Sequence, residues 1–480
     1  MFVTNSKYLS RLQCHKRLWY EKNHPERASA ISKSQQRIID QSIEVSVLAR
    51  DKFPGGTLID SSVLEESLKQ TEDAMQRGVP YIIVPTFIFD GIWVRCDVLQ
   101  KDLKSWRIIK VTASTEVKAE HLHELAAQKY VLTEQGVSVS STQLMRINRE
   151  CVYPDLSNLF VFEDVTDRVD PLMDNVPSDI ETFKTILEGD VEPVVSIGKQ
   201  CDVPHNCPFK HHCWEFVPEP SIFTIPGLRW DKKIWLIESG VFSLEDLPAD
   251  FALTQNQRAY VDMVLNNQPE IDAEAVRNEL SELEYPIHFF DFETLNPAVP
   301  RFEGLSPYDH FPFQYSCHIL QSDGSITHHE YLHTDTTDPR LPLVESLLDH
   351  ISDAGSVMVY GASFERKRLE ELAQYFPEYS GALLSVVSRL WDQLLIIRNH
   401  YKHPGFGGSN SLKNVLPILV PSLSYQNLDV REGDDAQAVW ELMINTTGDI
   451  DKGNMINQLK EYCMMDTLAM VEIHKILLHL

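Results

Sequence analysis

Acidic residues in the last two hundred positions stand at spacings that could hold metal ions. Asp291 and Glu293 lie two residues apart at the end of the apolar run IHFFDFETL. Alternate side chains of a strand point to the same face, so both carboxylates would share one side of a buried strand. Such carboxylates repel each other unless a cation lies between them, and hard oxygen ligands suit magnesium or manganese. The pair predicts a divalent-metal site.

Two further acidic segments follow along the chain. VMVYGASFERKRLEELAQYF predicts an apolar strand, a turn of small residues and a helix that begins near Glu365. QLKEYCMMDTLAMVEIHKILL predicts a helix on which Tyr462 and Asp466, four residues apart, share one face. Each segment alone has an ordinary structural interpretation, such as an acid favoured at a helix start. All of them in this order favour a catalytic site.

An Asp-x-Glu strand, an acid at a helix start and a Tyr-x-x-x-Asp helix resemble the exonuclease superfamily named for its four acids (DEDD), in the subclass that uses tyrosine. The resemblance covers residues 285–480. It implies an RNase H-like α/β fold and a hydrolase that removes nucleotides from the 3′ end with two ions of Mg²⁺ or Mn²⁺. It implies four metal ligands and a tyrosine that orients the attacking water: Asp291, Glu293, Glu365, Asp466 and Tyr462.

The resemblance extends to two accessory residues and includes two departures. Asp392 is expected as an accessory acid near the site, and Lys413 as a contact to phosphate. Glu365 stands where the superfamily usually has Asp, which alters the reach of that ligand. Gly361 stands where an Asn is usual, so a positioning side chain is missing.

A cluster of cysteines indicates a second metal centre. Three of the eight cysteines form the pattern Cys-x5-Cys-x5-Cys in QCDVPHNCPFKHHCW, and Cys14 lies far upstream. Four thiolates suit an iron–sulfur cluster or zinc, and nearby histidines keep a mixed-ligand zinc site open. The cysteines of the expected centre are Cys14, Cys201, Cys207 and Cys213, and the neighbouring histidines are His205, His211 and His212.

One early cysteine and three late ones resemble the RecB-like (PD-(D/E)XK-type) nucleases that carry a [4Fe–4S] cluster, such as the CRISPR-adaptation nuclease. The resemblance implies a restriction-endonuclease-like mixed α/β core, an Asp on one strand, Glu-x-Lys on the next and Gln on the following helix. Asp97 and Gln128 match the first and last of these, whereas Lys110 and Thr112 occupy the Glu-x-Lys positions. We therefore expect a degenerate nuclease site in which Lys110 neutralises Asp97, in a domain that binds or guides nucleic acid.

The elements that must position these residues divide into three predicted domains: residues 1–217, a helical connector over 218–284, and residues 285–480. In the first domain we expect a helix over 38–54, a hairpin over 81–100 turning at Asp90–Gly91, a strand over 105–114 and a helix over 117–136. In the connector we expect helices over 230–240, 254–267 and 273–284.

Bulk composition narrows the class of protein. The 480 residues are 43% hydrophobic and 24% charged, and no apolar run reaches bilayer length or forms a signal peptide. These absences favour a cytoplasmic protein without a membrane partner. The net charge of −27 argues against tight sequence-independent binding of DNA, although bound cations would offset acidic metal sites.

The leading hypothesis is a metal-dependent 3′→5′ exonuclease that acts on single-stranded DNA or DNA ends, guided by the N-terminal iron–sulfur domain. The order of parts resembles a bacterial fusion family, which implies DNA repair or defence. One alternative is a weakened nucleic-acid-binding or assembly protein, favoured by Gly361, Glu365, the changed residues at 110 and 112 and the net charge. Another is an RNA exonuclease. Protein partners stay open.

Overall fold

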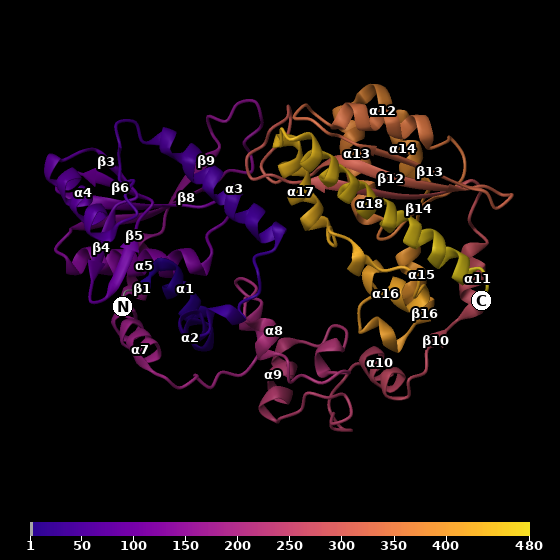
Figure 1. Ribbon diagram of the computed structural model, residues 1–480, viewed down its shortest axis with the longest axis horizontal. Helices are drawn as coiled ribbons and strands as arrows, with labels where there is room; N and C mark the ends of the chain where they lie inside the picture. The colour runs from indigo at the N-terminus through magenta and orange to yellow at the C-terminus, as the bar shows by residue number, and fades with distance from the viewer. Residues whose placement is uncertain (1–2) are drawn as a thin grey trace. The chain divides into compact units, whose positions relative to one another are not determined.

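The computed structural model describes residues 3–480 and separates into two compact units, both of mixed α/β class as expected (Figure 1). The first unit comprises the chain up to Ile31, Arg37–Phe216 and Pro297–Asp309. The second comprises Ser32–Gln36, Val217–Asn296 and His310–Leu480. Among the described residues, every helix is too short or too polar to cross a membrane.

A six-stranded mixed sheet with the order β2-β3-β6-β7-β8-β9 forms the centre of the first unit. Its strands are β2 (Thr57–Leu58), β3 (Tyr81–Ile83), β6 (Val98–Asp102), β7 (Ser105–Val111), β8 (Val139–Ile147) and β9 (Phe160–Asp164). The pairs β2–β3 and β7–β8 are parallel, and the other neighbouring pairs are antiparallel.

The predicted turn at Asp90–Gly91 is confirmed, because both residues have positive φ, 46° and 82°. It joins β4 (Thr86–Phe89) to β5 (Ile92–Arg95). This hairpin belongs to a separate three-stranded sheet with β1 (Val3–Thr4), whereas the flanking β3 and β6 pair with each other in the larger sheet. The segment predicted as a single hairpin therefore forms two strand pairs: β4 with β5, and outside them β3 with β6.

Helices complete the first unit. They are α1 (Asn5–Gln13), α2 (His15–Asn23), α3 (Lys33–Ala49), α4 (Leu64–Arg77), α5 (Ala119–Glu134), α6 (Thr166–Met173), α7 (Val176–Glu188) and α8 (Lys210–Cys213). The predicted helices near 38–54 and 117–136 correspond to α3 and α5. The segment Pro297–Asp309 adds Ala298 and Val299 to a core with Val45 and Ile109.

The second unit is built on a five-stranded sheet with the order β13-β12-β11-β14-β15. Its strands are β11 (Ile287–Leu295), β12 (Phe311–Leu320), β13 (Ile326–Leu332), β14 (Val357–Val359) and β15 (Leu390–Asp392). Strands β13, β12 and β11 form an antiparallel meander, and β14 and β15 continue it in parallel.

Strand β11 is covered on both faces, which explains its nearly continuous apolar sequence. Phe290 and Phe292 pack in a core with α12 (Arg340–His350), α13 (Ser363–Tyr375) and α14 (Ser380–Ser388). Phe289 points to the other face, where Met470 of α18 (Asp449–Leu477) covers it. Figure 1 shows α18 in yellow, running along the sheet.

The predicted connector folds as part of the second unit and is not a body of its own. It contains α9 (Trp230–Glu238), α10 (Gln255–Leu265) and α11 (Ala273–Leu280), close to the predicted helices. Its short strand β10 (Glu270–Ile271) pairs with β16 (Tyr401–Lys402). The remaining helices of the unit are α15 (Gln393–His400), α16 (Leu412–Leu419) and α17 (Gly433–Asn445).

Candidate metal-binding active site

The four acids that the sequence singles out line one cavity of about 850 Å³ in the second unit. Strand β11 brings Asp291 and Glu293, α13 brings Glu365, and α18 brings Asp466. Glu293, Glu365 and Asp466 are buried, and Asp291 is half-buried. Side chains from three segments separated by many residues therefore meet at one place.

The alternation of β11 explains how two of these acids share a face. Phe292, which lies between them, packs into the core on the α12–α14 side. The ladder with β12 shifts its register between Glu293 and Thr294, and such a bulge re-aims the neighbouring side chains.

The Cys463 sulfur joins the acid pair. One ligand atom each from Asp291, Glu293 and Cys463 lies within 4.8 Å of the others. Burial raises the pKa of the Cys463 thiol well above its usual value. A protonated thiol is a poor ligand for hard cations, so the carboxylates are better suited than the thiol to hold Mg²⁺ or Mn²⁺.

Glu365 enters the cavity from the first turn of α13. It is 4% exposed, and its Oε2 atom has no hydrogen-bond partner. A buried carboxylate oxygen without a donor is costly, and a bound cation would satisfy it.

Asp392 holds the turn that carries Glu365. Its carboxylate accepts the backbone N–H groups of Gly361 at 2.9 Å and Ala362 at 3.1 Å. Gly361 has φ +103°, a conformation that favours glycine, which accounts for the absence of the Asn expected there. Asp392 also caps α15 through the Leu394 N–H at 3.1 Å. These bonds make Asp392 a positioning residue, and it does not line the cavity.

Two tyrosines and one lysine surround Asp466. Tyr462 lines the cavity on the same face of α18. Tyr425, which the sequence did not single out, donates its hydroxyl to Asp466 Oδ1 at 2.5 Å. The Lys413 ammonium lies 5.4 Å from the ring centre of Tyr462 and 5.8 Å from that of Tyr425. Within residues 3–480 this ammonium has no ion pair, so it is available to an anionic ligand.

The acids raise one another's pKa values. Burial, followed by the charges of Asp466 and Glu293, raises the pKa of Asp291 well above its usual range. Burial and the charge of Asp466 do the same for Glu293. Burial raises the pKa of Glu365 to about 7 and that of Asp466 to about 6, and Lys413 only partly opposes the shift at Asp466. Divalent cations would remove this conflict.

The cavity contains further polar residues that the sequence analysis missed. His310 Nδ1 lies 2.9 Å from Thr294 Oγ1, and its ring meets Phe364 edge-on. Of these residues only Glu432 and Asp434 have an acidic spacing, two positions apart beside Gly433, and no strand or apolar run marks it as a site. The missed residues are His310, Arg398, Tyr425, Glu432 and Asp434; all except Tyr425 line the cavity.

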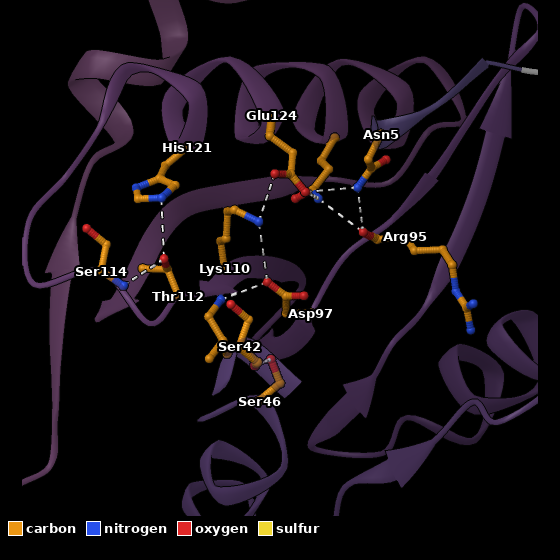
Figure 2. A network of polar contacts seen from close by, with 12 residues as sticks. Asn5, Ser42, Ser46, Arg95, Asp97, Lys110, Thr112, Ser114, His121 and Glu124 are labelled. Atoms are coloured by element: carbon orange, nitrogen blue, oxygen red, sulfur yellow. Dashed lines mark hydrogen bonds and ion pairs between the residues drawn. The ribbon is translucent and has the colours of Figure 1, made fainter. Parts of the chain in front are cut away.

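The residues predicted to form a degenerate site lie in the first unit and are part of the polar network drawn in Figure 2. Lys110 Nζ lies 3.8 Å from Asp97 Oδ2, so the ion pair suggested by the sequence is present, and 2.8 Å from Glu124 Oε2. Glu124, on α5, was not predicted. Burial lowers the pKa of Lys110, but the Glu124 and Asp97 charges outweigh this and hold it above its ordinary value. The ammonium thus pairs with both carboxylates of a partly buried acidic site.

The other residues of this site are held by hydrogen bonds, and Asn5 and Gln128 also donate to Glu124 Oε1, at 3.1 and 3.4 Å. Gln128 Nε2 donates to the Arg95 carbonyl at 3.1 Å, and Asn5 Nδ2 donates to the same carbonyl at 2.9 Å. Thr112 Oγ1 lies 3.3 Å from His121 Nε2 (Figure 2). Thr112 therefore contacts His121, whereas Lys110 pairs with Asp97 and Glu124.

The four predicted cysteines come together from both ends of the first unit. Cys14 separates α1 from α2, and Cys213 ends α8. Nearby Cys14 and Cys201 contribute to raising the pKa of Cys207 and Cys213, although burial is the largest cause. Gln13 Nε2 joins the two segments by donating to the carbonyls of Gln200 at 2.7 Å and His205 at 2.6 Å.

The spacing and neighbours of these sulfurs bear on the choice of metal. Among residues 3–480, no three of them lie mutually within 4.8 Å, whereas tetrahedral zinc with bonds of about 2.3 Å needs sulfurs about 3.8 Å apart. His212 Nε2 contacts Tyr20 Oη at 3.0 Å, and His211 Nδ1 contacts Ser29 Oγ at 3.0 Å. These two ring nitrogens therefore already have polar partners.

In a comparison with known proteins, residues 288–411 match a family described as a domain of unknown function (DUF2779). The chain is 26% identical over 281 residues to the uncharacterized protein UU173 of Ureaplasma parvum serovar 3, covering 51% of this chain and 39% of that protein. It is 26% identical over 219 residues to the uncharacterized protein MG366 of Mycoplasma genitalium, covering 41% and 32%. The matched part spans about a third of the length of these relatives, whose names assign no activity.

The ion pairs of Lys110 yield a prediction about stability. We expect Lys110→Met to lower the free energy of unfolding of the first unit by about 1 to 2 kcal/mol, because it leaves the partly buried carboxylates of Asp97 and Glu124 close together without a cation. Urea unfolding followed by circular dichroism measures the loss. Adding Asp97→Asn and Glu124→Gln should restore stability, and Lys184→Met, which removes an exposed cation, should change little. Wild-type stability of the single variant would contradict the assignment.

The raised pKa values predict how stability depends on pH without metal. Glu365 and Asp466 bind protons more tightly when folded, so their contribution is complete below about pH 4 and is lost as pH rises through 6 and 7. We expect the metal-free protein to melt at a lower temperature at pH 8 than at pH 5.5. Millimolar Mg²⁺ should remove most of this difference. Glu365→Gln should show a shallower decline, and an equal slope in both proteins would refute this account.

Proposed function

We propose that the second unit is a two-metal-ion 3′→5′ exonuclease whose substrate is nucleic acid, DNA before RNA. The observation that carries this proposal is the meeting of four buried acids from β11, α13 and α18 in one cavity, with a Glu365 oxygen that has no hydrogen-bond donor. The sheet supports it as well: an antiparallel meander continued by two parallel strands is the arrangement expected of an RNase H-like core.

The charges around the cavity support the same conclusion. Six carboxylates and two Lys or Arg side chains line it, which leaves four negative charges when all groups are ionised. Two divalent cations would neutralise that excess.

In this proposal the acids and the two tyrosines have separate roles. Asp291, Glu293, Glu365 and Asp466 would hold the ions, which supply an activated water and stabilise the leaving oxygen. Tyr425 fixes the orientation of the Asp466 carboxylate by its hydrogen bond. Tyr462, on the same face of α18, is placed to orient the attacking water.

Lys413 completes this set. Its ammonium lies over the Tyr462 ring and has no ion pair within the described chain, and a cation near the metal ligands attracts the substrate phosphate. It also partly offsets the charge of the acids before a metal binds.

Activity of a metal-ligand variant tests the proposal. We expect Asp291→Ala with Glu293→Ala to abolish Mn²⁺-dependent shortening of 5′-labelled oligonucleotides, since both carboxylates of one strand are removed. Asp323→Asn, an exposed acid in the β12–β13 turn, serves as the matched control and should retain activity. Single-stranded DNA, duplex DNA and RNA of one sequence, followed on denaturing gels, identify the preferred strand and the polarity. Undiminished cutting by the double variant would refute the assignment.

We further propose that the first unit carries a [4Fe–4S] cluster on Cys14, Cys201, Cys207 and Cys213 and guides the nucleic acid without cutting it. The position of Cys14 far upstream of the other three cysteines and the polar partners of His211 and His212 support the cluster over zinc. The Lys110 ammonium favours a non-cutting role, since it fills the place where a nuclease of this class needs a metal. The setting that we propose for this combination is DNA repair or defence in the cytoplasm.

Elemental content tests the cluster. Protein purified anaerobically should be brown and contain about four iron atoms per chain with little zinc. Cys207→Ser should lose the iron and the visible absorption, whereas Cys151→Ser, a buried cysteine outside the cluster, should retain both. Stoichiometric zinc without iron would exclude the cluster.

A binding or assembly protein is the second candidate function. The observations that favour it are Lys110 in the first unit and the longer acid at Glu365 in the second. A wild-type protein that binds oligonucleotides in Mn²⁺ but shortens none of them would establish this alternative.

A further inference from the structure

A second cavity of about 650 Å³ adjoins the acid cavity within the second unit. The two cavities share Arg398 and Asn410 in their walls. One side of the second cavity comes from the connector, through Tyr260 and Met263 of α10, and the other from the segment after α15. We call it the connector cavity.

Specific contacts fix the connector wall. Strand β10 pairs with β16, and His400 Nε2 lies 2.7 Å from Glu279 Oε1. Gly408 has φ +78°, and a Cβ atom there would come within 1.8 Å of the Thr224 carbonyl oxygen. The backbones approach so closely that only glycine fits, and the cavity is therefore a built feature of the unit.

Arg398 lies at the junction of the two cavities. Its side chain is exposed at the end of α15 and, within the described chain, has no hydrogen bond or ion pair. The other basic residues of the connector cavity are occupied. Lys402 pairs with Glu270 at 3.4 Å, and His403 Nδ1 accepts the Gly405 N–H at 3.0 Å. The free guanidinium is suited to a phosphate, which it can bind through two parallel hydrogen bonds.

The connector cavity differs from the acid cavity in charge. Its one carboxylate, Glu270, is paired, and the rest of its lining is neutral apart from the basic residues. Amide side chains such as Asn256 and Asn410 can meet base edges, and the Tyr260 ring and Met263 offer apolar surface to sugars and bases. This combination fits a nucleotide chain and does not fit a metal ion.

We propose that the connector cavity holds the strand on the 5′ side of the scissile phosphate, with Arg398 contacting the phosphate that lies between the two cavities. The proposal rests on the exonuclease function proposed above and assigns the connector a role in it: α10 and its neighbours form one wall of the substrate path. The ligand class is single-stranded nucleic acid, recognised mainly by its backbone.

A pair of substrates separates this role from catalysis. The p-nitrophenyl ester of thymidine 5′-monophosphate has a scissile phosphate but no upstream strand, whereas a 20-nucleotide oligomer has both. We expect Arg398→Ala to raise KM for the oligomer about tenfold with little change in kcat, because a charge-assisted contact to phosphate is lost. Hydrolysis of the ester, which has no upstream phosphate, should fall much less than hydrolysis of the oligomer. Lys475→Ala, a surface cation on α18 paired with Glu472, is the matched control and should alter neither substrate.

Binding measurements supply a readout independent of turnover. In Ca²⁺, the slope of log Kd against log salt for a labelled 20-mer should fall by about 0.7 in Arg398→Ala, as for the loss of one phosphate contact on a single strand. Oligomers with 4-thiothymidine one to three nucleotides from the 3′ end should cross-link to peptides that contain α10. DNA and RNA versions of each oligomer show which strand the cavity prefers.

The outcomes distinguish this inference from the proposed function. If the wild-type protein hydrolyses both substrates but Arg398→Ala keeps the wild-type KM and salt slope, the connector cavity is not the strand path and the exonuclease assignment stands. If the wild-type protein hydrolyses neither substrate, the exonuclease assignment fails and the strand path fails with it. Cross-links confined to other segments would also overturn the strand path.

Discussion

Burying several carboxylates side by side is the constraint on which the second unit depends. Each acid of the cavity loses hydration, and each lies close enough to the others to disfavour its ionised form. The central strand, the start of one helix and the longest helix nevertheless bring these groups together. Such an arrangement persists when a ligand compensates it, and the hydrogen bonds of Tyr425 and the charge of Lys413 compensate only part. In the function that we propose, divalent cations compensate the remainder.

The first unit meets the same constraint in a different way. Asp97 and Glu124 are also close together and partly buried, but the ammonium of Lys110 pairs with both and supplies the positive charge from within the chain. A cation that belongs to the protein cannot activate a water or leave with a product. One buried acidic site is therefore complete as it stands, whereas the other is incomplete until ions bind. This contrast is the physical reason for assigning catalysis to the second unit.

The sequence predicted the acids and much less of their surroundings. The period of two in β11 and the spacing of four in α18 report side-chain direction directly, so residue spacing alone places Asp291, Glu293, Tyr462 and Asp466 on common faces. Lys110 could be recognised because it replaced an expected acid. Tyr425, Glu124 and Arg398 could not be found, because their roles depend on which distant segment they approach.

The three connector helices were predicted near their observed bounds, but not their union with the second unit. That union depends on β10 pairing with residues some 130 positions later, and on the contact of Gly408 with Thr224.

The strong acidity of the chain sets how a nucleic acid can bind it. A net charge of −27 repels a polyanion at long range, so attraction must come from contacts made at short distance. Arg398 and Lys413 are the two Lys or Arg side chains that line the acid cavity, and both lack an ion pair within residues 3–480. With two divalent cations bound, the acid cavity becomes neutral and these two side chains are left to meet phosphates. Metal binding would then precede substrate binding, because the strand could enter only after the charge of the acids had been offset. The order follows from electrostatics alone and makes the metal a requirement for binding as well as for catalysis.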